Sequence, residues 1–135
     1  MALELPEALT IARQMDAKIK GETITQLHLS DTCTSLIRQG FINLHQVDLD
    51  NHIVASVTSQ GKWVFVNLEP EFYLLFALET GGKLLYHFPD LSSLQGKYHV
   101  KVNFSDGSSV TEAITGWGWA KAFNAHDLAF QRYRK

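Results

Sequence analysis

The first residues of this 135-residue chain that could take part in chemistry are acidic side chains at its N-terminus. Glu4 and Glu7 flank Pro6 directly before an apolar pattern of helical period. A carboxylate in this place can give and accept protons in a reaction. Proline and acidic residues are also favoured in the first turn of any helix. Residue types alone leave both interpretations of Glu4 open.

Two further positions offer contacts of the kind that nucleic acids make. Lys62 follows Gly61 in a predicted tight turn, where its ammonium group either contacts a phosphate or keeps an exposed hairpin tip soluble. Trp117 lies between Gly116 and Gly118. Its ring could project and insert between bases, or it could pack in the core or in a protein interface.

Disulfide and metal chemistry are not expected. Cys33 is the single cysteine, so no disulfide can form within the chain. The six histidines include no pair at a ligand spacing such as His-x3-His. We therefore predict no metal and no cofactor.

The charge of the chain argues against a large basic surface. Its formal net charge is -2, and the basic residues are spread out except for Arg132, Arg134 and Lys135. Sequence-independent DNA affinity comes mainly from lysine and arginine neutralising phosphates. Any contact with DNA is therefore expected to be weak or to need help.

One helix and a series of strands must position these residues. Over residues 6–20 apolar side chains recur at three- and four-residue steps, and Gly21 ends the pattern. Beyond Gly21 the period changes to two, which is typical of strands. The expected strands are residues 23–29, 53–58, 62–68, 72–78, 83–88, 98–104 and 108–115.

These elements predict a mainly β fold with one N-terminal α-helix. Short strands at this spacing indicate an antiparallel two-sheet β-sandwich or barrel of about seven or eight strands, with the helix packed against it. Between residues 31 and 50, Leu36 and Ile37 suggest a helical turn, and Phe41 and Ile42 a short strand.

The composition is that of one soluble globular domain, with 45% hydrophobic and 19% charged residues. No stretch approaches the roughly 20 apolar residues that span a bilayer. The N-terminus also has no apolar signal core. A cytoplasmic location without membrane contact is therefore expected.

Five stretches in order resemble one known family. They are Glu4-Leu5-Pro6-Glu7, residues 21–24, residues 59–66, residues 78–84, and His99-Val100 with Ser105-Asp106-Gly107. Together they resemble the N-terminal domain of the formamidopyrimidine-DNA glycosylase and endonuclease VIII (Fpg/Nei) family. The resemblance implies a domain over residues 1–123 and a tail or truncated interdomain linker over 124–135. The family's helix-two-turn-helix domain and zinc finger would then be missing from this chain.

The resemblance also assigns roles at the N-terminus. In that family the mature chain begins with a proline whose amine attacks the sugar, and the next glutamate moves protons. Glu4 matches that glutamate, whereas Leu3 occupies the place of the nucleophilic proline. The amine of Ala2, exposed if Met1 is removed, is a less favoured nucleophile because small displacements cost much rate. Catalysis is therefore expected to be impaired.

The DNA-contacting positions of the family are only partly kept. Lys62 matches the lysine that contacts the phosphate beside the lesion, as the resemblance implies. Thr80 stands where the family has a methionine that fills the space left by the flipped base. Residues 113–119 correspond to a second loop of the family that contacts this space, but they lack its two arginines. Without these arginines, a core or interface role for Trp117 is favoured over a role as a wedge between bases.

Three interpretations of the chain remain open. The first is a DNA-repair glycosylase-like domain that acts in base excision on damaged double-stranded DNA, favoured by Glu4, Pro6, Glu7 and Lys62. The second is a non-catalytic module of the same fold that binds DNA or protein, favoured by Leu3 and Thr80. A protein partner would then supply the missing second domain. An unrelated small sandwich that matches by chance is the third possibility.

Overall fold

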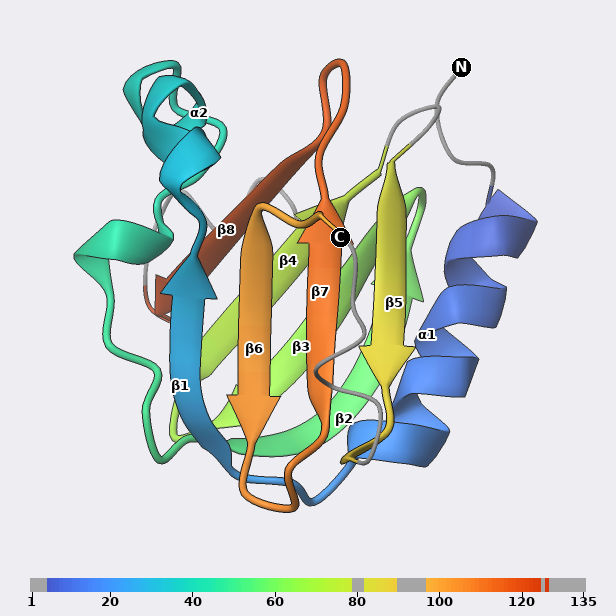
Figure 1. The fold of residues 1–135 in the computed structure, drawn as a ribbon. Helices are drawn as coiled ribbons and strands as arrows, with labels where there is room; N and C mark the ends of the chain where they lie inside the picture. The colour runs from blue at the N-terminus through green and yellow to red at the C-terminus, as the bar shows by residue number, and fades with distance from the viewer. Residues whose placement is uncertain (1–4, 79–81, 90–96, 125, 127–135) are drawn as a thin grey trace.

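The computed structural model describes residues 5–78, 82–89, 97–124 and 126, with the side chains of residues 5–7 excepted (Figure 1). Two four-stranded antiparallel sheets pack face to face, and helix α1 (Leu5–Ile19) precedes them. The first sheet has the order β1 (Ile24–Leu29), β6 (Val100–Phe104), β7 (Ser109–Ala113), β5 (Lys83–His87). The second has the order β2 (Ile53–Gln60), β3 (Trp63–Glu69), β4 (Phe72–Ala77), β8 (Trp119–Asn124). The predicted fold class is confirmed.

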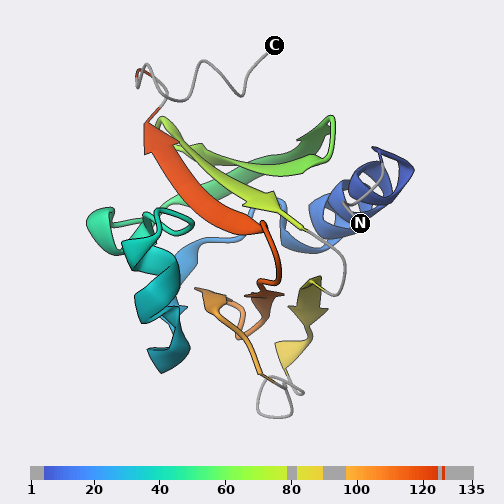
Figure 2. The same cartoon turned by 90° about the horizontal axis from the view of Figure 1, so that it is seen from above.

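Helix α1 forms along the apolar stripe that the sequence predicts. Ala8, Ala12, Met15 and Ile19 are buried on one face, and Gly21 takes the positive φ of 87° that ends the helix. The helix packs mainly on β2 and β3. Figure 2 shows that it lies beside the sandwich, along the side where β2 and β5 end their sheets.

The core lies between the inner faces of the two sheets. Strand alternation directs every second side chain inward, so that Val64, Val66, Leu74 and Phe76 of the second sheet meet the first. The inward residues of the first sheet are Val100, Val102, Phe104, Val110 and, unexpectedly, Glu112. Burial of these apolar side chains is the main term that holds the sheets together.

The predicted strands all occur, with ends shifted by a few residues. Strand β8 was not predicted. Its inward residues Ala120 and Ala122 have weak β propensity, and the glycines just before the strand are typical of a loop. The helical turn expected around Leu36 is helix α2 (Thr34–Arg38), between the 3₁₀ turns η1 (Asp31–Cys33) and η2 (Leu44–Gln46). The strand expected at Phe41 and Ile42 is a single bridge from Ile42 to Ala120.

The outer edge of β8 is covered by the segment of residues 41–43. The backbone N–H of Ala120 donates to the carbonyl of Phe41 at 3.0 Å. The amide of Asn43 donates to the carbonyl of Ala122 and accepts from its N–H, each at 2.8 Å. A side-chain amide thus takes the place of a neighbouring strand along this edge. None of the helices in the described part of the chain could span a membrane.

Candidate nucleic-acid interface

The strand register gathers three connections at one end of the sandwich. Trp63 pairs with Ala77, and Ala77 pairs with Trp119. The hairpin that carries Lys62, the end of β4 and the start of β8 therefore lie side by side. The β7–β8 connection projects at the top of Figure 1, and α1 begins at this same end. We call this the loop end of the molecule.

Lys62 lies at the tip of the β2–β3 hairpin. The turn is formed at Gly61, which has a φ of 59°, and the Lys62 side chain is exposed. Lys62 makes no ion pair with another described residue. Its ammonium group is therefore accessible to an anion that approaches the loop end, and its phosphate contact stays a prediction.

Trp117 projects from the β7–β8 connection and is 75% exposed. Its ring meets the ring of Phe41 edge to face, with centroids 5.9 Å apart. The core role considered for this tryptophan is wrong, because most of its side chain is exposed to solvent. A wedge between bases and a protein interface both remain predictions for Trp117.

Gly118 fixes the connection against the end of β4. A Cβ at this position would lie 2.9 Å from the Ala77 carbonyl oxygen and 3.2 Å from that of Thr115. Both neighbours are backbone atoms, so they cannot move aside as a flexible side chain would. Only glycine permits this close approach, and it determines where Trp117 projects.

The N-terminal candidates lie outside the described residues. Ala2, Leu3 and Glu4 precede the first described residue, Leu5, and Thr80 falls in the gap between residues 78 and 82. The start of α1 lies at the loop end (Figure 1). The acid/base role of Glu4 and the terminal amine of Ala2 stay predictions.

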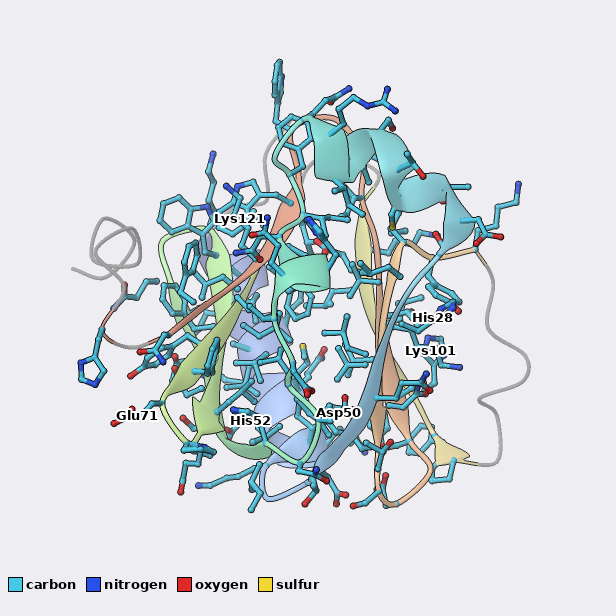
Figure 3. The ribbon with its side chains drawn as sticks, turned by 90° about the vertical axis from the view of Figure 1, so that its left-hand side faces the viewer. His28, Asp50, His52, Glu71, Lys101 and Lys121 are labelled. Carbon is cyan, nitrogen blue, oxygen red and sulfur yellow. The ribbon has the colours of Figure 1, made fainter. Side chains whose placement is uncertain are left out.

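A groove of about 580 Å³ opens where the first sheet reaches the loop end. Its lining residues are His28, Ser30, Asp31, Thr32, Lys97, Tyr98, His99 and Ala113. Figure 3 shows His28 and its cross-strand partner Lys101 on the outer side of this sheet. The groove could not be predicted from the sequence, because its residues come from separate segments that only the β1–β6–β7 pairing brings together.

Two side chains beside the groove are buried and have perturbed pKa values. Burial raises the pKa of the Glu112 carboxyl well above its ordinary value, and neither of its oxygens has a hydrogen-bond partner among the described residues. Burial likewise raises the pKa of the Cys33 thiol, which donates to the His99 carbonyl at 3.0 Å. Glu112 points inward from β7, so it faces the core and not the groove.

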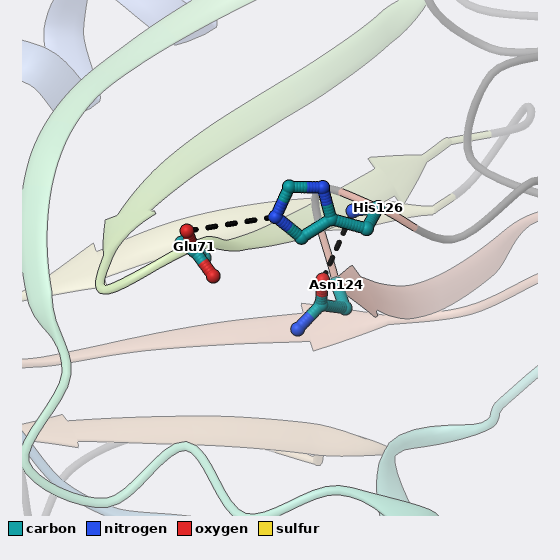
Figure 4. Close-up of polar contacts among 3 residues, drawn as sticks. All are labelled: Glu71, Asn124 and His126. Carbon is teal, nitrogen blue, oxygen red and sulfur yellow. Dashed lines mark hydrogen bonds and ion pairs between the residues drawn. The ribbon is translucent and has the colours of Figure 1, made fainter.

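The opposite end of the second sheet holds an exposed ion pair. His126 Nε2 lies 3.5 Å from Glu71 Oε1, and the His126 N–H donates to Asn124 Oδ1 at 2.9 Å (Figure 4). Phe72 pairs with Asn124, which places this cluster at the far end of β4 from Lys62. An exposed pair of this kind contributes little to stability. Among the described residues no group of three or more His, Cys, Asp and Glu could hold a metal ion.

The fold is that of the N-terminal half of solved DNA glycosylases. Lactococcus lactis formamidopyrimidine-DNA glycosylase, bound non-covalently to DNA that contains an AP site, matches with a TM-score of 0.77 and 19% identity. The match covers 97% of this chain and 49% of that one. MutM in complex with DNA containing carbocyclic 8-oxo-G gives a TM-score of 0.76 and 23% identity, over 96% and 48% of the two chains.

The sequence comparison defines the family more closely. Residues 2–113 match the formamidopyrimidine-DNA glycosylase N-terminal domain, and the chain belongs to this family. The formamidopyrimidine-DNA glycosylase of Lactococcus lactis subsp. cremoris is 25% identical over 116 residues, which are 85% of this chain and 41% of that protein. The resemblance drawn from the sequence is confirmed, and the chain spans less than half the length of this relative.

Proposed function

We propose that this domain binds damaged duplex DNA through its loop end and forms the DNA-holding part of a base-excision repair glycosylase, with little or no catalytic activity of its own. One observation carries the proposal. In a domain of this family, the fold brings the exposed Lys62 hairpin and the projecting Trp117 connection to the same end. A phosphate contact beside an insertable ring is an arrangement suited to duplex DNA.

The affinity of this contact is expected to be modest. The net charge of -2 gives no excess of cations to neutralise phosphates. The chain spans 41% of the curated relative. A second protein surface that faces the loop end across the duplex would raise this affinity, and such a partner surface is part of the proposal.

The proposal of impaired catalysis rests on Leu3. A Schiff base needs a free amine, and the backbone amide nitrogen of Leu3 is not one. We expect no covalent adduct when the protein is treated with borohydride on an oligonucleotide that contains an abasic site. Deleting residues 1–2 together with Leu3→Pro should restore adduct formation if Glu4 and the DNA-binding surface are intact.

Two outcomes of this experiment contradict the assignment. An adduct formed by the unaltered chain and lost when the Ala2 amine is blocked would show that the terminal amine reacts despite its position. An altered chain that binds duplex as tightly as before yet forms no adduct would show that Leu3 is not the sole catalytic defect.

Binding through Lys62 is expected to be sensitive to salt. Each phosphate contact contributes about 0.9 to the slope of log affinity against log salt concentration. Lys62→Ala should lower that slope by about this amount, as measured by titrating labelled duplex at several salt concentrations. Trp117→Ala should leave the slope unchanged and weaken binding only if the ring is a wedge.

The control is Lys20→Ala, because Lys20 is exposed and lies beyond the opposite end of α1. This substitution should change neither affinity nor slope. Tight binding that is unaffected by Lys62→Ala would refute the phosphate contact. An absence of duplex binding at low salt would refute the DNA-binding function and favour the protein-interaction module.

A further inference from the structure

The outer face of the second sheet carries apolar residues that form a cluster of their own. They come from β3, β4 and β8, and they point away from the first sheet because strand alternation directs their neighbours inward. Leu75 lies at the centre of this face, since it pairs with Phe65 on one side and with Lys121 on the other. We call the following residues the outer cluster: Trp63, Phe65, Tyr73, Leu75, Trp119 and Phe123.

The centre of the outer cluster is as buried as the core between the sheets. Leu75 has 0% of its surface exposed, Phe65 has 4% and Phe123 has 7%. Side chains stand roughly perpendicular to a sheet, so neighbours on an open face cover one another from the sides and leave their outer ends in water. The complete burial of Leu75 therefore requires a cover that lies over the face.

No helix or strand in the described part of the chain lies over this face. Figure 2 shows the first sheet on the inner side of the second, and helices α1 and α2 at the two sides of the sandwich. The buried stripe of α1 belongs to the core cluster between the sheets. The cover must then come from residues outside the described ranges, which are 1–4, 79–81, 90–96, 125 and 127–135.

The segment of residues 127–135 follows the strand that borders the outer cluster. Strand β8 ends at Asn124, which pairs with Phe72 at the start of β4. The His126 N–H donates to Asn124 Oδ1 at 2.9 Å, and the His126 ring pairs with Glu71, which places residue 126 beside β4 (Figure 4). The nine residues that follow can extend about 30 Å. This exceeds the span of about 20 Å for the six residues of β4.

The other segments have connections that lead them elsewhere. Residues 79–81 lie between β4 and β5, so they must pass from the second sheet to the first. Residues 90–96 join β5 to β6, which both belong to the first sheet. Residues 1–4 precede α1, whose stripe packs into the core between the sheets. Residues 127–135 are therefore the best placed to cover the outer cluster.

The composition of this segment suits the face. Leu128, Phe130 and Tyr133 give it apolar surface, and aromatic rings pack favourably on one another edge to face or offset. We propose that residues 127–135 dock on the outer cluster, with these three side chains against the sheet. The docked segment holds the face of β8, as the segment of residues 41–43 holds its edge. The inference does not depend on DNA binding.

Contacts between side chains in solution test the docking directly. The full chain is labelled with ¹³C and ¹⁵N, and nuclear Overhauser effects are recorded from the side chains of Leu75 and Phe123. We expect effects to Leu128, Phe130 or Tyr133. Effects to residues 1–4 or 90–96 in their place would refute the assignment of the segment. Effects that arise only between differently labelled molecules would show that a second copy covers the face, which would also refute it.

Trypsin gives a second and independent measurement. Cleavage after Arg132 and Arg134 requires the segment to leave the sheet, and its rate then follows the population of the open state. Phe130→Ser removes a large apolar contact, so this variant should lose its C-terminal residues about tenfold faster than the unaltered protein. Gln131→Ser is the matched control, because it changes a polar residue of the same segment, and its rate should be unaltered. Equal rates for Phe130→Ser and the unaltered protein would refute the docking.

Discussion

Glu112→Met is expected to stabilise the domain by about 1–3 kcal/mol at pH 5, because the substitution removes a buried carboxyl whose oxygens have no hydrogen-bond partner among the described residues. Glu112 is fully buried on the inner face of β7, two residues after Val110 on the same face of the strand. Methionine has a similar length and is apolar, so it can fill the same space without leaving a cavity.

The gain from Glu112→Met is expected to grow as the pH rises. Burial raises the pKa of Glu112 in the folded state, so the folded protein holds a proton that the unfolded chain releases above its ordinary pKa of about 4.3. Stability of the unaltered protein is therefore lost with rising pH between these two pKa values, by up to about 1.4 kcal/mol for each pH unit. The Glu112→Met variant has no carboxyl at this position, so its stability does not fall with rising pH for this reason.

Thermal unfolding of both proteins between pH 4 and pH 8 measures this effect. The difference in Tm should be smallest at pH 4 and widen steadily above it. Glu69→Met is the matched control, because Glu69 is exposed at the end of β3. Its Tm difference should be small and independent of pH. A lower Tm for Glu112→Met at every pH would show that the carboxyl contributes favourable interactions to the fold.

Asn43→Ala is expected to destabilise the domain by about 2–3 kcal/mol. The substitution removes both hydrogen bonds between the Asn43 amide and the backbone of Ala122. Each such bond contributes about 1 kcal/mol, and the cost rises where a partly buried backbone group is left unpaired. Chemical denaturation gives the free energy of unfolding, and hydrogen exchange at the Ala122 amide reports the local loss.

Asn67→Ala provides the comparison for Asn43→Ala. The Asn67 amide also makes two hydrogen bonds, at 2.8 and 3.2 Å, but its partners are the hydroxyls of Ser56 and Thr58. These hydroxyls can turn to water, so a cost below about 1 kcal/mol is expected. Equal losses for the two variants would show that the backbone of β8 does not depend on Asn43.

The regular elements could be predicted because each carries a simple periodic signal. The buried stripe Ala8, Ala12, Met15 and Ile19 has helical spacing. The seven predicted strands are short runs rich in β-branched and aromatic residues between turn residues, although β3, β4 and β7 are buried on both faces over part of their length. Strand β8 alternates in burial, but its inward residues Ala120 and Ala122 are small and carry a weak strand signal. The residue pattern is misleading at Glu112, where a glutamate occupies a core position that would be expected to hold an apolar residue.

The candidate site was predictable only where one short segment contains it. Lys62 and Trp117 stand out beside glycines that mark turns, and their exposure agrees with this. The groove combines His28 with Lys97 and Ala113, and nothing local in the sequence links these residues. Their proximity follows from the pairing of β1 with β6 and of β6 with β7, which long-range packing determines.

The Asn43 contact with β8 also bears on how copies of this protein behave toward each other. A strand at the edge of a sheet offers unpaired N–H and C=O groups, and these recruit strands from other molecules during aggregation. Asn43 and the Phe41 carbonyl occupy those groups on Ala120 and Ala122. The segment of residues 41–43 therefore keeps the second sheet from growing at this edge, which favours a protein whose copies stay separate.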